Sequence, residues 1–129
     1  MKRVFLSFDS EDIQQVRGLK LLAANPKYDL EFYDESLATA IDSKDAEYIK
    51  RKISDKITRA SITVCLIGAK THQSGWVDWE IAKSIEAGNE IIVMALKGID
   101  RATLPKLIKE KGLAFHSWDP EYLGTLIGD

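Results

Sequence analysis

The sequence predicts a three-layer α/β domain, in which a parallel sheet of about five strands is covered by helices on both faces. Apolar, β-branched runs alternate with longer amphipathic segments at intervals of roughly 20 to 30 residues, which favours right-handed βαβ crossovers. Two runs, residues 61–67 and 90–96, are apolar almost throughout, as in central strands covered on both sides. The chain has 129 residues, of which 45% are hydrophobic, and this size and composition predict a single domain over residues 1–129.

The first predicted unit is a strand followed by a helix. Residues 4–8 are mostly apolar and aromatic, as in a short buried strand. The polar residues 9–12 supply an N-cap and first-turn acids for a helix over about 11–24. Asn25-Pro26 ends that helix, because proline disfavours a helical conformation in the residue before it.

A brief strand and the clearest helix come next. Residues 30–33 predict the second strand, and the polar residues 34–42 predict a loop. From Ser43 to Ala60, apolar residues recur at steps of three and four, so one face of a helix is expected to be buried. That helix leads into the first of the two apolar strands.

The last part of the chain repeats the alternation. A helix from about Trp76 is expected to end at Gly88-Asn89, a pair suited to a left-handed C-cap, with the stripe Val77, Ile81, Ala82 and Ile85 buried. After the strand at 90–96, the expected elements are a helix over 103–111, an edge strand over 113–115 and a terminal helical turn over 122–127.

Composition excludes several classes of function. The apolar runs are far shorter than the ~18 residues of a membrane span, and no signal peptide follows Met1, so we expect a cytoplasmic protein that does not bind membranes. The net charge of -2 gives no electrostatic reason to bind nucleic acid. One cysteine, Cys65, and two histidines, His72 and His116, cannot form a disulfide or the usual zinc sites, so no metal is expected.

The predicted sheet places the functional site at the carboxyl ends of its strands, where open α/β sheets bind ligands. Helical geometry sets Glu80 one turn beyond Trp76 and about 40° away around the helix, so a carboxylate lies beside a large aromatic side chain. Spacing alone favours the simpler interpretation, in which Glu80 is a solvated helix residue and Trp76 a packing residue.

Four segments carry a resemblance to a known family. They are Arg3–Phe8, Val64–Gly68, Thr71–Ile81 with its Trp-Val-x-x-Glu-Ile element, and Lys83–Asn89. In order and spacing they resemble the small bacterial TIR-like proteins, including those of Thoeris anti-phage defence. The resemblance implies the flavodoxin-like TIR fold. It also implies that Glu80 is the catalytic residue of an enzyme that splits NAD at the nicotinamide–ribose bond, with NAD as substrate and no cofactor.

The chemistry of this reaction suits a single carboxylate. Nicotinamide leaves its ribose as a neutral base and needs no proton from a general acid, unlike an ordinary glycoside leaving group. A fixed carboxylate can stabilise the oxocarbenium-like ribose that remains. The residues expected to bind substrate around Glu80 are Phe8, Asp9, Asp34, Thr71 and Trp76. For Asp9, helix capping is an equally good interpretation, and we expect Tyr33 to pack rather than bind.

Two functional hypotheses follow. In the first, the chain makes ADP-ribose or a cyclic ADP-ribose-type signal from NAD, and the signal activates a separate effector; the sequence does not choose between hydrolysis and cyclisation. In the second, the chain is a non-catalytic TIR-like module that acts by self-association or nucleotide binding. A response-regulator receiver is disfavoured, because Gly68-Ala69 stands where its phosphoacceptor would follow the third strand.

Overall fold

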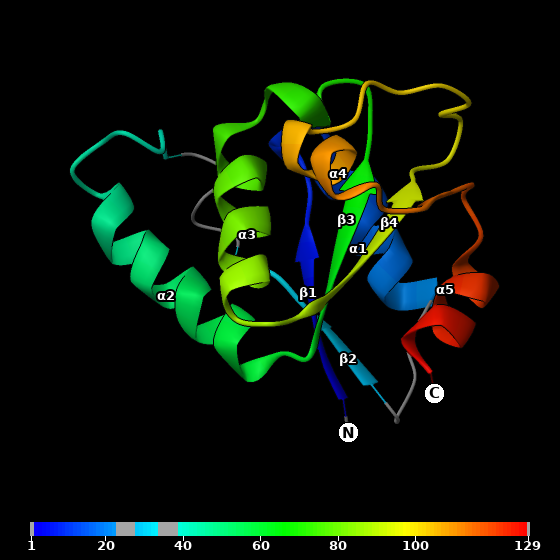
Figure 1. Ribbon diagram of the computed structural model, residues 1–129, viewed down its shortest axis with the longest axis horizontal. Coiled ribbons are helices and arrows are strands. Elements are labelled where there is room, and N and C mark those ends of the chain that lie inside the picture. The colour runs from blue at the N-terminus through cyan, green and yellow to red at the C-terminus, as the bar shows by residue number, and fades with distance from the viewer. Residues whose placement is uncertain (1, 23–27, 34–38, 129) are drawn as a thin grey trace.

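The computed structural model describes residues 2–22, 28–33 and 39–128 and confirms the predicted α/β class (Figure 1). Five parallel strands form one sheet in the order β2-β1-β3-β4-β5. The strands are β1 (Lys2–Ser7), β2 (Tyr28–Glu31), β3 (Ile62–Ile67), β4 (Glu90–Ala95) and β5 (Phe115–His116). The direction of winding reverses between β1 and β3, which makes the carboxyl ends of these two strands the expected ligand crevice.

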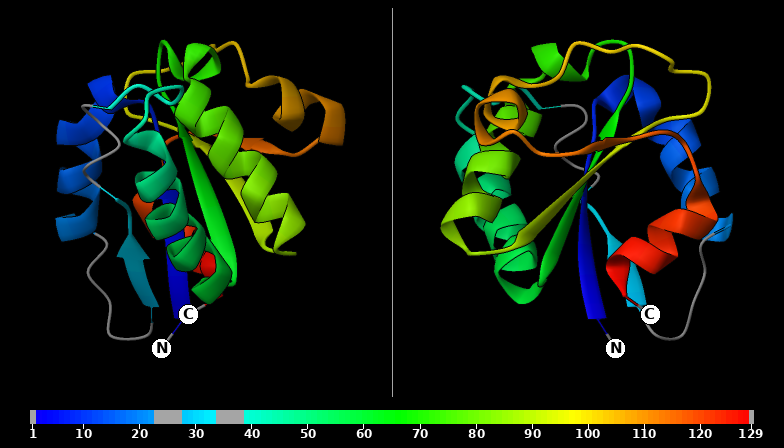
Figure 2. Two further views of the ribbon diagram at one scale, coloured as in Figure 1. Left: turned by 90° about the vertical axis from the view of Figure 1, so that its left-hand side faces the viewer. Right: turned by 45° about the vertical axis from the view of Figure 1, so that its right-hand side comes forward.

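Helices cover both faces of the sheet, which gives the three layers (Figure 2). One face carries α1 (Ile13–Leu22) and α5 (Pro120–Ile127), and the other carries α2 (Ala46–Arg59), α3 (Gly75–Glu86) and α4 (Lys106–Lys111). Two short 3₁₀ helices, η1 (Ser10–Asp12) and η3 (Thr71–Gln73), follow β1 and β3. No helix among the described residues is long and apolar enough to cross a membrane.

The alternation of side chains along β1 divides the core in two. Val4 and Leu6 pack in the cluster that includes α1 and α5, whereas Phe5 packs with the buried residues of α2 on the opposite face. Ser7 follows Phe5 at a spacing of two and so points to the face that carries α3. All four side chains are buried, and the strand therefore ends with a polar group inside the protein.

The boundaries of two strands differ from those expected. β2 begins at Tyr28 and ends before Phe32. Tyr28 and Leu30 are its buried residues, and both pair with residues of β1. β5 starts at Phe115, not at 113, because Gly112 ends α4 in a left-handed conformation and the Leu113 amide donates back to the helix. Local capping therefore delays the last strand.

Helix α3 begins and ends where its capping residues predict, but it buries a different stripe. The Ser74 hydroxyl accepts a hydrogen bond from the Val77 amide at the N-terminus. Gly88 has φ +79°, the left-handed conformation expected beyond the C-terminus. The fully buried residues are Val77, Glu80, Ile81 and Ser84, whereas Ala82 and Ile85 are only half-buried. The helix is thus rotated so that Glu80 and Ser84 face the sheet.

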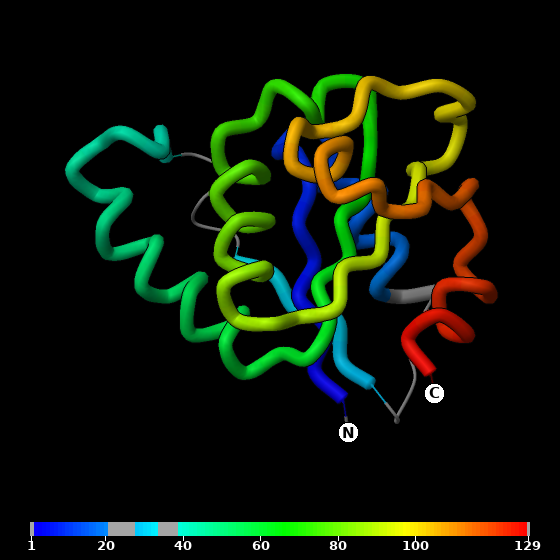
Figure 3. The backbone as a smooth tube through the Cα atoms, viewed as in Figure 1, coloured from blue at the N-terminus to red at the C-terminus, as the bar shows by residue number. Residues whose placement is uncertain are grey.

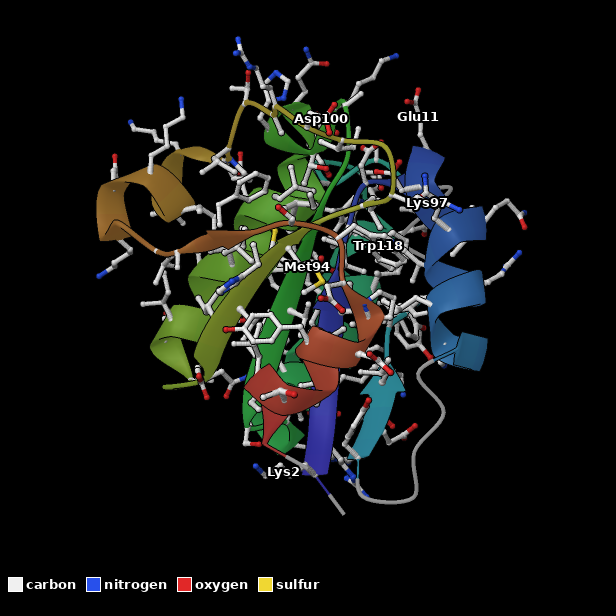
Figure 4. All side chains as sticks on the ribbon, turned by 90° about the vertical axis from the view of Figure 1, so that its right-hand side faces the viewer. Lys2, Glu11, Met94, Lys97, Asp100 and Trp118 are labelled. Atoms are coloured by element: carbon white, nitrogen blue, oxygen red, sulfur yellow. The ribbon has the colours of Figure 1, made fainter. Side chains whose placement is uncertain are left out.

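The two ends of the sheet have different surroundings. The first strand and the last helix meet at one end, where the Lys2 ammonium donates to the Ile127 carbonyl at 2.8 Å (Figure 3). Glu11, after β1, and Lys97, after β4, lie at the opposite end (Figure 4). That opposite end holds the carboxyl termini of the strands and the candidate site.

Candidate functional site

A cavity of about 360 Å³ opens at the carboxyl ends of β1 and β2, close to the N-terminus of α3. This volume lies within the range of about 300–1,000 Å³ that is typical of small-molecule pockets. The described residues that line it are Leu6, Phe8, Ser10, Phe32, Tyr33, Thr39, Ala40, Ser74, Trp76 and Glu80. Among them Glu80 alone carries a carboxyl group, and none is basic.

Aromatic rings form the walls of the cavity. Phe8 and Phe32 meet edge to face with their centroids 5.1 Å apart. The opposite wall is Trp76, whose indole N–H donates to the Thr39 carbonyl at 2.7 Å. This bond fixes the ring and joins the segment before α2 to the start of α3. The walls are therefore rigid aromatic surfaces of the kind that accept a flat heterocycle or an organic cation.

Glu80 lines the same cavity, one helical turn beyond Trp76, and is almost fully withdrawn from solvent. The residue is 6% exposed, and Oε1 of its carboxyl group accepts a hydrogen bond from the Ser7 hydroxyl at 2.8 Å. Burial raises the pKa of Glu80 to about 8, and the hydrogen bond from Ser7 opposes that rise. With this pKa the carboxyl group is mostly neutral at pH 7, and a positive charge nearby would favour the carboxylate.

A line of buried hydrogen bonds fixes α3 against the sheet. The Ser84 hydroxyl donates to the Glu80 backbone carbonyl at 2.8 Å and lies 2.6 Å from the Thr63 hydroxyl of β3. The Asn89 side-chain amide donates in turn to Thr63 and to the Ile57 carbonyl at the end of α2. These satisfied polar groups hold one rotation of the helix, and that rotation directs Glu80 into the cavity.

The structure brings together only part of the predicted site. Phe8, Trp76 and Glu80 line the same cavity. Asp9 does not line it: its carboxylate accepts the Glu11 amide at 3.2 Å and caps η1, the alternative role expected for it. Thr71 is buried, and its hydroxyl accepts the Gly68 amide at 2.7 Å within the loop after β3. Asp34 lies outside the described residues.

Two cavity features escaped the sequence-based reasoning. Ser7 contacts the carboxyl group directly. Alternation along β1 puts Ser7 on the same face as Phe5, so the sequence could have predicted that its side chain points into the protein. Phe32 and Tyr33, which the sequence places in the second strand, line the cavity because β2 ends before them, and Tyr33 also packs against the core cluster of α2 as expected. The pairing of Ser7 with Glu80 is not visible in the local sequence, because the two residues are 73 positions apart in the chain.

The site has the properties of a cation-stabilising pocket. A carboxyl group withdrawn from water interacts more strongly with a developing positive charge than an exposed one. No second described carboxyl group lines the cavity that could act as a general acid. Among the described residues, no group of three or more His, Cys, Asp or Glu side chains is placed to hold a metal ion.

Two solved structures share this α/β fold, and one of them is a TIR domain. A TIR domain of the Toll-related receptor TRR-2 from Hydra magnipapillata superposes with a TM-score of 0.55 at 13% identity, covering 95% of this chain and 89% of that one. The Clostridium botulinum CMP N-glycosidase BcmB superposes with a TM-score of 0.64 at 16% identity, covering 97% and 98% of the two chains. At these identities the likeness concerns the fold.

Sequence comparison identifies the class of this chain, the TIR-like domains, and its family within that class. The family described as the TIR-like domain of the Thoeris protein ThsB matches residues 5–101, and the chain belongs to this family. A relative from Bacillus cereus (strain MSX-D12), named "Putative cyclic ADP-D-ribose synthase ThsB1", is 33% identical over 100 residues. The match covers 70% of this chain and 50% of the relative, so it spans about half of the relative's length. The predicted resemblance to Thoeris TIR-like proteins is confirmed.

Proposed function

We propose that this chain cleaves the nicotinamide–ribose bond of NAD with Glu80 as the catalytic residue, and that it releases a cyclic ADP-ribose-type signal for a separate effector. The observation that carries the proposal is the buried carboxyl group of Glu80 in an aromatic-walled cavity at the sheet's switch point. The name of the ThsB1 relative supports the same substrate and product class.

The cavity suits the oxidised nicotinamide ring. That ring carries a positive charge in NAD and none in NADH, and the cavity offers it aromatic faces and an acidic group without any described basic residue. Entry of the cation favours ionisation of Glu80, because an opposite charge lowers the pKa that burial has raised. Binding of the substrate therefore converts Glu80 to the form that the reaction needs.

The bond-breaking step needs no general acid. The bond between C1′ of the ribose and the ring nitrogen breaks, its electron pair stays on the nitrogen, and nicotinamide departs as a neutral molecule. The Glu80 carboxylate stabilises the positive charge that develops on the ribose. A nucleophile within the same molecule then forms a new bond to C1′ and loses one proton, which gives a cyclic product; attack by water instead gives ADP-ribose.

The test is release of nicotinamide from NAD by the wild-type chain and by Glu80→Gln. We expect release by the wild type and a loss of at least 100-fold in the variant. Glu90→Gln serves as the matched control, because it removes an exposed glutamate at the start of β4, remote from the cavity lining. Reaction in ¹⁸O-labelled water with mass spectrometry of the product separates hydrolysis, which incorporates the label, from cyclisation, which does not.

The non-catalytic module is the competing function. It predicts that no nicotinamide is released at high protein concentration or in extracts of phage-infected cells, and that nucleotide binding or self-association continues unchanged in Glu80→Gln. CMP belongs in the same assay, because the CMP N-glycosidase BcmB shares the fold. Release of cytosine but not nicotinamide would assign the cavity to a nucleoside monophosphate.

A further inference from the structure

We infer that Ser7 is a positioning residue for Glu80, holding Oε1 of the carboxyl group so that Oε2 is directed at the ligand. The Ser7 hydroxyl is the one described side-chain partner of the carboxyl group, at 2.8 Å. Both residues are buried, and they come from different elements, the end of β1 and the first half of α3. The inference rests on the proposed function in one respect only, namely that Glu80 acts on a substrate.

The direction of this hydrogen bond assigns the two carboxyl oxygens different roles. In the ionised form the Ser7 hydroxyl donates to Oε1, because a carboxylate oxygen only accepts hydrogen bonds. Since Glu80 lines the cavity and no described residue bonds to Oε2, this is the oxygen left to face the ligand.

The backbone around Ser7 is rigid, as a positioning role requires. β1 lies between β2 and β3, and Ser7 pairs in register with Cys65. Glu80 is equally fixed, because its backbone carbonyl accepts the Ser84 hydroxyl. The two side chains are thus held by separate elements, and the bond between them has little freedom to rearrange.

The environment of the pair is electrostatically simple. Burial raises the pKa of Glu80, and the hydrogen bond from Ser7 opposes that rise. From β3 the Cys65 thiol faces the same region; burial raises its pKa, with a further rise from Glu80, so the thiol stays neutral. Removing the Ser7 hydroxyl therefore removes the one side-chain hydrogen bond to the carboxyl group that the described part of the chain supplies.

The decisive variant is Ser7→Ala, which removes the donor from a buried position without adding volume. A hydrogen bond to a charged group corresponds to about one to two pH units in the midpoint of ionisation. We expect the Glu80 midpoint to move upward by that amount. The plot of log kcat/KM against pH moves with it, which lowers kcat/KM at pH 7 by about ten- to one-hundredfold. Ser7→Thr keeps the hydroxyl and is expected to restore the midpoint.

The matched control is Ser84→Ala, which removes an equally buried serine hydroxyl that bonds to the backbone of Glu80 instead of its carboxyl group. It is expected to lower the melting temperature and to move the ionisation midpoint much less than Ser7→Ala does, because the hydrogen bond to the carboxyl group is kept. A midpoint that stays unchanged in Ser7→Ala, or that moves equally in Ser84→Ala, overturns the inference.

A readout without turnover separates this inference from the proposed function. The ¹³C resonance of the Glu80 carboxyl group, identified by its absence in Glu80→Gln, is titrated in the ligand-free protein. An upward shift of its midpoint in Ser7→Ala supports the role of Ser7 even if no nicotinamide is released, in which case the proposed function alone fails. Equal midpoints in the wild type and Ser7→Ala overturn the role of Ser7 even if NAD is cleaved.

Discussion

Replacement of Glu80 by glutamine should make the protein more stable at neutral pH, and the gain should grow with pH. Glu80 has a pKa of about 8 in the folded chain against an ordinary value of 4.5. Between these values the unfolded chain has lost the proton that the folded chain keeps, so raising the pH favours unfolding. Glutamine has no such proton, keeps nearly the same shape, and still offers Ser7 an oxygen acceptor.

The size of this effect follows from the two pKa values. Stability falls by about 1.4 kcal/mol per pH unit while one proton separates the two states. From pH 4.5 to 7 the wild type therefore loses about 3 kcal/mol through Glu80, and about 5 kcal/mol once the pH exceeds 8. At pH 7 the gain in Glu80→Gln corresponds to a rise of roughly 10 °C in melting temperature for a domain of this size.

The assay is urea denaturation of the wild type, Glu80→Gln and Glu90→Gln at pH 5, 6, 7 and 8. The difference in unfolding free energy between Glu80→Gln and the wild type should rise at every step up to pH 8, and Glu90→Gln should show no such rise. A difference that stays constant over this range would refute the reasoning, because Glu80 would then ionise as readily in the folded chain as in the unfolded one.

Two further predictions concern catalysis and the loop after β3. In the wild type, kcat/KM for nicotinamide release should rise about tenfold per pH unit and level off above a midpoint near 8. The midpoint for kcat should be lower, because the bound cation favours the carboxylate. A flat profile from pH 6 to 9 would contradict this prediction. Gly68→Ala should destabilise the chain by about 1–3 kcal/mol, because a Cβ there meets the Asp12 carboxyl group. Asp12→Ala should recover most of that loss in a double-mutant cycle by urea denaturation, and strictly additive effects would show that the two residues do not interact.

Much of the fold was predictable because its signals are local. The apolar runs that became β3 and β4 are buried along most of their length, and the three- and four-residue steps that became α2 bury Ile49, Ile53 and Ile57. Capping chemistry predicted an N-cap among residues 9–12, where Asp9 caps η1, and the C-terminal end of α3 before Gly88. At β2 the prediction was wrong because the boundary depends on which residues pair with β1, and at β5 it was wrong because the left-handed Gly112 after α4 delays the strand.

The rotation of α3 is the point at which local signals failed. Periodicity favoured burying Ala82 and Ile85, since both are apolar, but the helix buries Glu80 and Ser84. The hydroxyls of Ser7 and Thr63, on two different strands, satisfy these polar groups. No local pattern reports such partners, because they come from residues far away in the chain.

The sequence by itself determined the α/β class, the alternation of its elements and the placing of Glu80 early in a helix, since all of these depend on propensities and spacings within a few residues. Only the tertiary structure decided that the Glu80 carboxyl group is buried, that Ser7 donates to it, and that Phe8, Phe32 and Trp76 enclose it in one cavity. The reason is physical: a carboxyl group's pKa and reach are set by what surrounds it, and those neighbours come from distant parts of the chain that meet only on folding.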